Sequence, residues 1–364
     1  MKAIILAGGV GTRLRPLSCT RPKLLFPILN EPLLDRTLER LAETGVNGAT
    51  LAVKFMAETF MQRYGKSAHG LEISYSVERK PMRTGGAIKY AEELIGHEEP
   101  FLVLNGDIFT TIDYGSLIKK HKETDAVATL ALYRVEDPSR YGTVKLEKNG
   151  KITKFVEKAP SGQAPSNLIN AGIYVLDPKI FSYIPEGLPV SIEHEVFPKL
   201  AEEGKLFGHE FNELWMDIGK PADYLKANKI MLDTEKQKQT ISTSAKIGHD
   251  VQLNSPVMVG AEVSVGESSK IGPYTVIGKD ASVGSNVTVE NSVVFPLATI
   301  EDNAQVKGAV IGEGATIGAG TRISEGCIIG DYATIHEDLV ISKNVTVCHS
   351  KEVKENIPES KRII

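Results

Sequence analysis

Two patterns in the 364-residue sequence predict an α/β protein in which a layered α/β domain is followed by a parallel β-helix. Up to residue 232, short apolar runs alternate with segments of helical periodicity, which is the pattern of a parallel sheet covered by helices on both faces. Beyond residue 246, aliphatic residues recur every six positions, a period that suits neither a helix nor a simple amphipathic strand. We therefore expect two domains of different architecture.

Five apolar runs in the first part are expected to be strands, and they cover residues 2–8, 50–53, 72–77, 101–107 and 127–132. Helical patterns cover residues 31–45 and 85–95. In a sheet of this kind, ligands bind at the carboxyl ends of the strands. Residues that directly follow the strands are therefore the first candidates for a functional site.

The six-residue repeat follows a polar stretch, residues 233–246, that is expected to be a linker. We expect three flat faces with one hexapeptide on each and aliphatic side chains stacked inside, from residue 247 to 350, followed by a tail over 351–364. The register is predicted to slip back by one residue at Ile300 and again at Ile311. The predicted interior positions are Ile247, Leu253, Val259, Val265, Ile271, Ile277, Val283, Val289, Phe295, Ile300, Val306, Ile311, Ile317, Ile323, Ile329, Ile335, Ile341 and Val347.

Composition narrows the possible functions. A formal net charge of −4 argues against a protein that binds nucleic acid through a broad basic surface. No apolar run approaches the roughly 20 residues that span a bilayer, and the short run Ala3–Ala7 is not a signal peptide. The three scattered cysteines show no CxxC spacing, so we expect neither a disulfide framework nor a zinc site, and a cytoplasmic location.

The first strand runs into a glycine-rich turn, Gly8-Gly9-Val10-Gly11. Leu14 stands at the third glycine position of the dinucleotide fingerprint, and the Lys-Ser/Thr of a P-loop is missing. Glycines after a strand still let backbone N–H groups approach phosphate oxygens, and Arg13 and Lys23 add positive charge. A tight turn with solvated cations fits these residues equally well.

Two aspartates are candidate metal ligands. Asp107 ends a strongly apolar strand, and Asn105 shares its face if the strand extends that far. Asp217 follows soon after the only tryptophan and precedes a turn. Two carboxylates suit Mg²⁺, although each aspartate alone also fits a turn or a helix N-cap.

Polar residues near the strand over 152–158 are further candidates. Alternation places Glu157 and Lys158 on opposite faces, where both also fit as solvated surface charges. Asn170 alone also fits a turn.

Five blocks in a fixed order resemble the signature of the sugar-1-phosphate nucleotidyltransferase family. They are Leu6–Leu17 with Arg21-Pro22-Lys23, Leu104–Asp107, Phe155–Lys158, Asn170–Tyr174 and Trp215–Pro221. The similarity covers nearly the whole chain and implies a Rossmann-like nucleotidyltransferase domain followed by a left-handed β-helix of hexapeptide repeats. Two departures are Arg83-Thr84, where the family often has Gly-Thr, and Ala159 before Pro160.

The resemblance implies roles for named residues. Those implied to bind the nucleotide are Leu6, Ala7, Gly8, Gly9, Gly11, Thr12, Arg13, Lys23, Gly85 and Asn105. Those implied to bind the sugar phosphate are Asp107, Gly142, Glu157, Lys158 and Asn170. Arg13, Lys23 and Lys158 are the implied catalytic cations, and Asp107 and Asp217 the implied Mg²⁺ ligands.

The implied reaction is attack of a sugar-1-phosphate oxygen on the α-phosphorus of a nucleoside triphosphate, with pyrophosphate leaving. Ser191–Pro198 and Ile357–Ile364 are similar to mannose-1-phosphate guanylyltransferases, which favours GTP and mannose-1-phosphate. The alternatives are a glucose-1-phosphate thymidylyl- or uridylyltransferase, a bifunctional enzyme whose β-helix is an acyltransferase using His249, His336 or His349, and a non-catalytic regulatory paralogue. The flat faces of the β-helix also predict a homo-oligomer.

Overall fold

The structure is a computed structural model that describes residues 1–160 and 162–363. Ser161 and Ile364, the last residue of the predicted tail, lie outside the described residues. The chain forms two compact units, one from Met1–Gly9 with Leu34–Asp217 and the other from Val10–Leu33 with Ile218–Ile364. This division differs from the predicted boundaries at residues 232 and 247. The chain leaves the first unit within the glycine-rich turn, and Val10–Leu33 is called the signature segment below.

The first unit contains a ten-stranded sheet within the described residues. β1, β4, β6 and β7 run parallel to one another, whereas β12 pairs with β7 and β9 in antiparallel fashion. The predicted parallel sheet is therefore a mixed one. Its strands are β1 (Lys2–Ala7), β4 (Gly48–Val53), β5 (Ser67–Ala68), β6 (Leu71–Val77), β7 (Phe101–Asn105), β9 (Ala128–Arg134), β10 (Gly142–Leu146), β11 (Ile152–Glu157), β12 (Leu168–Leu176) and β13 (Leu206–Glu210).

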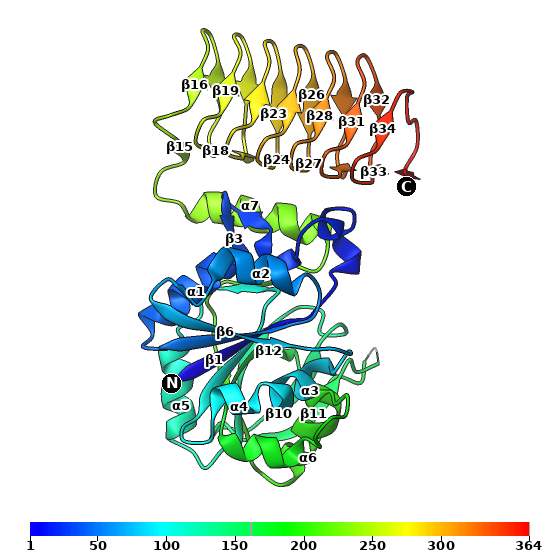
Figure 1. Ribbon diagram of the computed structural model, residues 1–364. Coiled ribbons are helices and arrows are strands. Elements are labelled where there is room, and N and C mark those ends of the chain that lie inside the picture. The colour runs from blue at the N-terminus through cyan, green and yellow to red at the C-terminus, as the bar shows by residue number, and fades with distance from the viewer. Residues whose placement is uncertain (161, 364) are drawn as a thin grey trace. The chain divides into compact units, whose positions relative to one another are not determined.

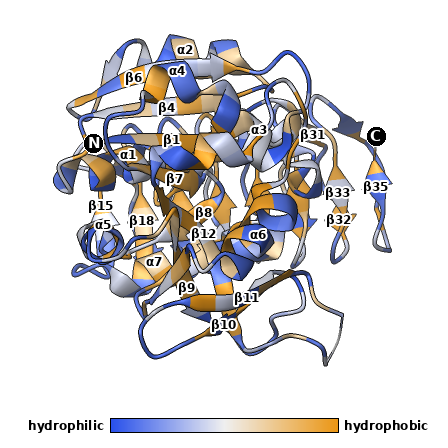
Figure 2. Ribbon diagram, turned by 90° about the horizontal axis from the view of Figure 1, so that it is seen from below, coloured by the Kyte–Doolittle hydropathy of each residue, from blue (hydrophilic) through white to orange (hydrophobic). Residues whose placement is uncertain are grey.

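The chain reverses its direction of travel across this sheet at β1. It runs from β1 to β4 and β6 on one side and then returns to β7 on the other side. Such a switch point opens a crevice at the carboxyl ends of the two strands, where open α/β sheets bind ligands. Apolar residues gather on these central strands, as Figure 2 shows for β1 and β7, and the residues after the strand ends carry the polar groups.

Helices cover both faces of the sheet, with α1 and α2 on one side and α3 and α4 on the other (Figure 1). The expected helix over 31–45 is α1, and the expected helix over 85–95 divides at Ala91 into α3 and α4. The helices of this unit are α1 (Leu33–Glu43), α2 (Ala57–Tyr64), α3 (Arg83–Tyr90), α4 (Glu92–Ile95), α5 (Tyr114–Lys122) and α6 (Phe197–Glu202), with a 3₁₀ helix over Pro178–Tyr183 and a π-helical turn over Ile192–Val196. A two-stranded ribbon pairs β8 (Ile108–Thr110) with β14 (Trp215–Asp217).

The second unit contains the predicted parallel β-helix, whose stacked coils are evident in Figure 1. Each strand pairs in parallel with the strand one coil later. The first sheet consists of β15 (Gln239–Ile241), β18 (Val257–Val259), β21 (Thr275–Ile277), β24 (Val293–Val294), β27 (Val310–Ile311), β30 (Ile328–Ile329), β33 (Thr346–Val347) and β35 (Arg362–Ile363). The second consists of β16 (Lys246–Ile247), β19 (Ser264–Val265), β22 (Ser282–Val283), β25 (Thr299–Ile300), β28 (Thr316–Ile317), β31 (Thr334–Ile335) and β34 (Glu352–Val353). The third consists of β17 (Gln252–Leu253), β20 (Lys270–Ile271), β23 (Thr288–Glu290), β26 (Gln305–Lys307), β29 (Arg322–Ile323) and β32 (Val340–Ile341).

The predicted interior position at Phe295 is wrong. Val294 pairs with Ile277 in the coil before it and with Ile311 in the coil after it, so Val294 occupies the interior position. The first register slip therefore comes between Val289 and Val294, one repeat earlier than predicted. Phe295 takes the place that Gly278 and Gly312 have in the neighbouring coils, and its side chain is absent from the apolar core of the β-helix. The smaller, β-branched valine suits the stacked interior, which leaves the phenyl ring outside.

The β-helix ladder extends past both of its predicted ends. β15 lies within the expected linker and pairs with β18, because backbone pairing does not require apolar side chains. β34 and β35 lie within the expected tail, where Ile357 is buried against the core.

Val10–Leu33 forms short 3₁₀ turns over Thr12–Leu14, Leu17–Cys19 and Lys23–Leu25, followed by β2 (Pro27–Ile28) and β3 (Glu31–Pro32). Helix α7 (Pro221–Thr234) belongs to the same unit. Among the described residues, none of the helices is long and apolar enough to cross a membrane.

Candidate functional site

The glycine turn begins at the carboxyl end of β1. Leu6 lies in register with Asn105 on β7, and the Gly106 N–H donates a hydrogen bond to the Leu6 carbonyl at 3.1 Å. A side chain on Gly8 would begin 3.4 Å from Oε1 of Glu78, and one on Gly9 would meet nothing within 4 Å. The turn therefore presents bare backbone at the switch point of the sheet, next to a carboxylate.

Glu78 is a residue that the sequence reasoning missed. It directly follows β6 and is 8% exposed, and its Oε2 accepts a hydrogen bond from the Met82 N–H at 3.0 Å. Burial raises the pKa of Glu78, while the Met82 hydrogen bond and the charge of Lys54 oppose that rise. The available signal was an acidic residue immediately after an alternating strand, at the sheet edge where ligands bind.

The rest of the turn belongs to the second unit. Gly11 has a left-handed backbone (φ 64°), and its carbonyl accepts a hydrogen bond from Ser18 Oγ at 2.8 Å. A side chain on Gly11 would begin 3.5 Å from the Cβ of Lys23. Lys23 is 7% exposed, whereas Arg13 is exposed. The left-handed backbone therefore favours glycine at this position, next to the start of the Lys23 side chain.

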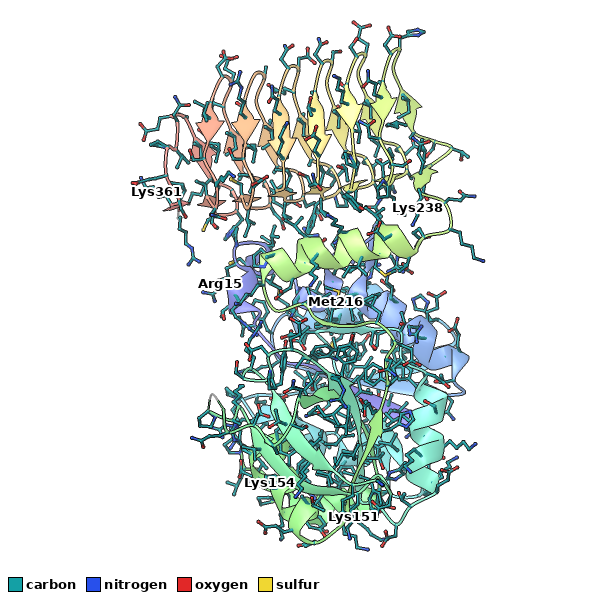
Figure 3. The ribbon with its side chains drawn as sticks, turned by 180° about the vertical axis from the view of Figure 1, so that it is seen from behind. Arg15, Lys151, Lys154, Met216, Lys238 and Lys361 are labelled. Carbon is teal, nitrogen blue, oxygen red and sulfur yellow. The ribbon has the colours of Figure 1, made fainter. Side chains whose placement is uncertain are left out.

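The β8–β14 ribbon places the backbones of the two predicted metal ligands near each other. Asp107 directly precedes β8, and Asp217 ends β14 opposite Ile108, the residue that follows Asp107. Met216 on the same strand is labelled in Figure 3. Arg140, which the sequence reasoning also missed, places Nη2 3.9 Å from Oδ2 of Asp217.

The chemistry of this donor pair fits a divalent cation. Mg²⁺ usually takes one or two carboxylates and completes its shell with phosphate and water oxygens. In the described part of the chain, no group of three or more His, Cys, Asp or Glu side chains forms a self-sufficient cage. A metal held by Asp107 and Asp217 would therefore need substrate oxygens, as expected for a phosphate-transferring site.

Asn105 supplies a second polar group close to this ribbon. Among the described residues, its buried Oδ1 has no hydrogen-bond partner. A side chain on Gly172 would begin 2.6 Å from its Nδ2, so the bulge in β12 is built around this amide. A buried acceptor left open in this way is available to a ligand donor.

Glu157 lies opposite Gly142 on the paired strands β11 and β10. A side chain on Gly142 would begin 2.6 Å from both Oε2 of Glu157 and Cζ of Phe155, so these side chains would have to move to admit it. Burial raises the pKa of Glu157, and the nearby charge of Glu193 raises it further. The predicted placement of Glu157 and Lys158 on opposite faces is wrong: β11 ends at Glu157, Lys158 has φ 49°, and its Nζ lies 3.8 Å from Oε1 of Glu157.

Asn170 is held rigidly by its neighbours. Its Nδ2 donates to the Tyr174 hydroxyl at 3.0 Å, and its Oδ1 accepts from the Gly172 N–H at 3.0 Å. Burial raises the pKa of Tyr174 well above its ordinary value, so the phenol stays protonated. The Asn170 amide is thus fixed in one orientation.

At the departure from the family pattern, Arg83 has a left-handed backbone (φ 57°), and its neighbour Thr84 is tied to Glu193. Thr84 donates to Oε2 of Glu193 at 2.5 Å, and Ser191 Oγ donates to the same oxygen at 2.7 Å. A side chain on Gly85 would begin 3.1 Å from the Val190 carbonyl oxygen, so the start of α3 packs directly on the segment before the π-helical turn. The threonine hydroxyl joins these two segments.

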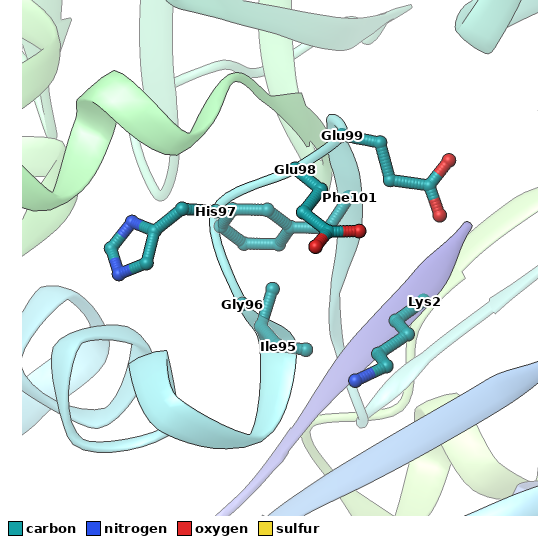
Figure 4. A pocket seen from close by; sticks show the side chains of 7 residues that line it. All are labelled: Lys2, Ile95, Gly96, His97, Glu98, Glu99 and Phe101. Carbon is teal, nitrogen blue, oxygen red and sulfur yellow. The ribbon is translucent and has the colours of Figure 1, made fainter.

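A pocket at the other end of the sheet is separate from these residues. It lies at the amino ends of β1 and β7 and is lined by Lys2, Ile95, Gly96, His97, Glu98, Glu99 and Phe101 (Figure 4). Because ligands of such sheets bind at the carboxyl ends, it is not the candidate site.

Two family models match parts of this chain. A family model described as nucleotidyl transferase matches residues 2–234, and one described as GMPPB C-terminal domain matches residues 253–364. The chain belongs to the nucleotidyl transferase family. The predicted enzyme class, a sugar-1-phosphate nucleotidyltransferase, is confirmed.

Relatives and solved structures match about two thirds of this nucleotidyltransferase. It is 40% identical over 243 residues to the mannose-1-phosphate guanylyltransferase catalytic subunit beta of Dictyostelium discoideum, a match that covers 66% of this chain and 67% of that protein. A putative glucose-1-phosphate thymidylyltransferase from Bacillus anthracis matches with a TM-score of 0.59 at 26% identity, covering 65% of this chain and 98% of that one. HddC from Yersinia pseudotuberculosis, complexed with GMP-PN, matches with a TM-score of 0.54 at 31% identity, covering 63% and 99%.

Proposed function

We propose that this nucleotidyltransferase transfers the guanylyl group of GTP to mannose-1-phosphate, giving GDP-mannose and pyrophosphate. The relative from Dictyostelium discoideum carries that activity in its name, and the HddC structure is a complex with GMP-PN. Within this chain, the observation that carries the choice of nucleotide is the buried carboxylate of Glu78 beside Gly8.

The hydrogen-bond donors of the base favour guanine beside Glu78. The base edge of guanine presents an N1–H and an amino group side by side, and a carboxylate accepts from both. Thymine and uracil present one N–H between two carbonyl oxygens, and a carboxylate repels those oxygens. Glu78 therefore favours GTP over the nucleotides of the thymidylyl- and uridylyltransferase alternatives.

The reaction requires positioning and charge neutralisation rather than a covalent enzyme intermediate. A phosphate oxygen of mannose-1-phosphate forms the new bond to the α-phosphorus, and the bond to the pyrophosphate oxygen breaks. Arg13 and Lys23 stabilise the negative charge of the leaving pyrophosphate, and backbone N–H groups from Gly8 to Thr12 donate to phosphate oxygens. Leu6, Ala7, Gly85 and Asn105 line the nucleotide in this proposal.

The sugar phosphate is assigned to the antiparallel side of the sheet. Glu157 and Asn170 bind sugar hydroxyls, Gly142 leaves room beside Glu157, and Lys158 neutralises the sugar phosphate. Mg²⁺ on Asp107 and Asp217 would supply further neutralisation of phosphate charge. We also propose that the enzyme works in the cytoplasm as a homo-oligomer assembled through the β-helix.

A substrate panel tests the proposal. Pyrophosphate release is measured with GTP, dTTP, UTP and ATP, each combined with mannose-1-phosphate or glucose-1-phosphate and with Mg²⁺. The expected result is that kcat/KM is highest for GTP with mannose-1-phosphate. A preference for dTTP or UTP with glucose-1-phosphate would replace this assignment with the alternative, and no turnover with any pair would favour a non-catalytic role.

A further inference from the structure

We propose that Arg21 is a positioning residue, and that three β-helix residues hold it so that Lys23 and the glycine turn keep the geometry that nucleotide binding needs. The three are Phe295, Glu313 and Asp331, called the docking edge here. They lie on the three successive turns that follow β24, β27 and β30. The inference rests on the proposed role of Lys23 in phosphate binding, and it gives the β-helix a part in catalysis besides assembly.

An ion-pair cluster forms the polar half of the contact. Nη2 of Arg21 lies 2.7 Å from Oδ2 of Asp331 and 2.8 Å from Oε2 of Glu313, and Thr20 donates to the same Asp331 oxygen. Burial alone would lower the pKa of Arg21, but the charges of Asp331 and Glu313 outweigh it and raise that pKa. The guanidinium is therefore fixed in its charged form between two carboxylates.

The burial of Asp331 is the strongest sign of a dedicated contact. Its side chain is fully buried, and the other oxygen, Oδ1, accepts the Glu313 N–H at 2.7 Å. The exposed Asp302 makes the same kind of contact with the Ser285 N–H, so what distinguishes Asp331 is its burial and its pairing with Arg21. A buried carboxylate is costly without a partner, and Arg21 of the signature segment is the cation that compensates it.

An aromatic cluster forms the apolar half. The Phe295 ring lies 6.1 Å from Phe26 and 6.0 Å from Tyr224 of α7, both edge to face, and Arg21 lies over it at 5.0 Å. Phe295 is fully buried although it lies outside the β-helix core. Its partners are thus the signature segment and α7, and the phenyl ring stands where neighbouring coils have glycine.

Few residues separate the docking edge from the glycine turn. Arg21 is two residues before Lys23, which begins a 3₁₀ turn and whose Cβ lies 3.5 Å from where a side chain on Gly11 would begin. Lys23 is nearly buried, so its stem has little freedom to compensate for a shift of the backbone. Misplacement of a binding group by about 1 Å is enough to cost orders of magnitude in rate.

The test compares Asp331→Asn and Arg21→Lys with a matched control, Glu325→Gln. Glu325 forms an exposed ion pair with Lys343 at 2.9 Å on the same β-helix, so the control removes one carboxylate without touching the signature segment. Steady-state pyrophosphate release gives kcat and KM for each substrate, circular dichroism checks folding, and titration with Mg²⁺ and a non-hydrolysable GTP analogue gives nucleotide affinity.

We expect Asp331→Asn to lower kcat/KM for GTP on the order of tenfold, with KM for mannose-1-phosphate changed less than about twofold. Arg21→Lys keeps the positive charge but loses the planar guanidinium that can donate to two carboxylates at once, so an intermediate loss of kcat/KM is expected. The double variant should be no worse than Asp331→Asn alone, because both changes break one interaction. Glu325→Gln should match the wild type.

Wild-type kcat/KM and nucleotide affinity in a folded Asp331→Asn protein would overturn the inference. Equal losses toward both substrates, or additive losses in the double variant, would do the same, since they indicate a general structural effect. If Asp331→Asn does not fold, Arg21→Lys decides by the same criteria. Failure of the proposed function is separate: the wild type would then prefer another substrate pair, and the variants would be compared with that pair.

Discussion

Replacing Phe295 by alanine is the sharpest perturbation of the contact between the signature segment and the β-helix. The ring is fully buried, and truncation of such a phenylalanine typically costs about 3–5 kcal/mol. The two edge-to-face contacts, to Phe26 and Tyr224, each contribute about 0.5–1.5 kcal/mol beyond burial. We therefore expect the signature segment to lose about 4 kcal/mol of protection against local opening.

Native-state hydrogen exchange of the full chain measures this loss by region. Exchange should rise in the peptides around Phe26 and Tyr224, whereas the strands of the β-helix stay protected, because Phe295 is not part of their core. Val294→Ala is the matched control. It truncates the adjacent side chain, which faces the β-helix interior, so its effect should fall on β24 and its neighbours instead.

Unchanged protection around Phe26 in a folded Phe295→Ala protein would refute the reasoning. So would an equal rise in exchange along the whole β-helix, since that result would mean that the ring supports the coils rather than the signature segment. A fall in kcat/KM for GTP is expected to accompany the local opening.

Three further predictions concern the first unit. Glu78→Gln should lower kcat/KM for GTP by about 10- to 100-fold and leave kcat/KM for dTTP unchanged, because a hydrogen bond to a charged group contributes about 1.5–3 kcal/mol. Because the pKa of Glu78 is raised, kcat/KM for GTP should also fall as the pH drops through that pKa, and this fall should be absent in the variant. Asp107→Ala should abolish Mg²⁺-dependent pyrophosphate release with an unchanged circular dichroism spectrum; wild-type-like turnover would exclude it as a metal ligand. Burial lowers the pKa of His121 to about 4, so the unfolded state binds a proton at a higher pH than the folded state does. About 3 kcal/mol of stability that is present above pH 6.5 should therefore be lost by pH 4. The midpoint of urea unfolding should depend less on pH in His121→Gln.

Local periodicity explains why the architecture was predictable. In the β-helix, each coil contacts only its neighbours, so a period of six residues in the chain translates directly into stacked faces. In the first unit, several of the predicted strands have apolar runs that end at the ligand edge, such as β1 and β7. Both signals lie within a few consecutive residues and need no knowledge of tertiary contacts.

Contacts between distant residues explain what was missed. Thr84 and Glu193 are 109 residues apart in the chain, and Arg21 and Asp331 are 310 apart. Nothing in the local sequence of either partner specifies the other. Lys158 was misplaced for a different reason: alternation was extended by one residue beyond the end of β11, where the backbone turns left-handed.

The error at Phe295 carries information of its own. In a repeat, the neighbouring coils dictate which residue fits each position, and at this turn they place glycine before and after. A bulky apolar residue there gains nothing inside the coil and would expose its ring to water. Such a substitution is stable only where something outside the repeat covers the ring, and here the signature segment and α7 do so. An apolar residue that breaks a solenoid's glycine column therefore indicates a docked segment, and the buried charge at Asp331 two turns later indicates the same surface by an independent route.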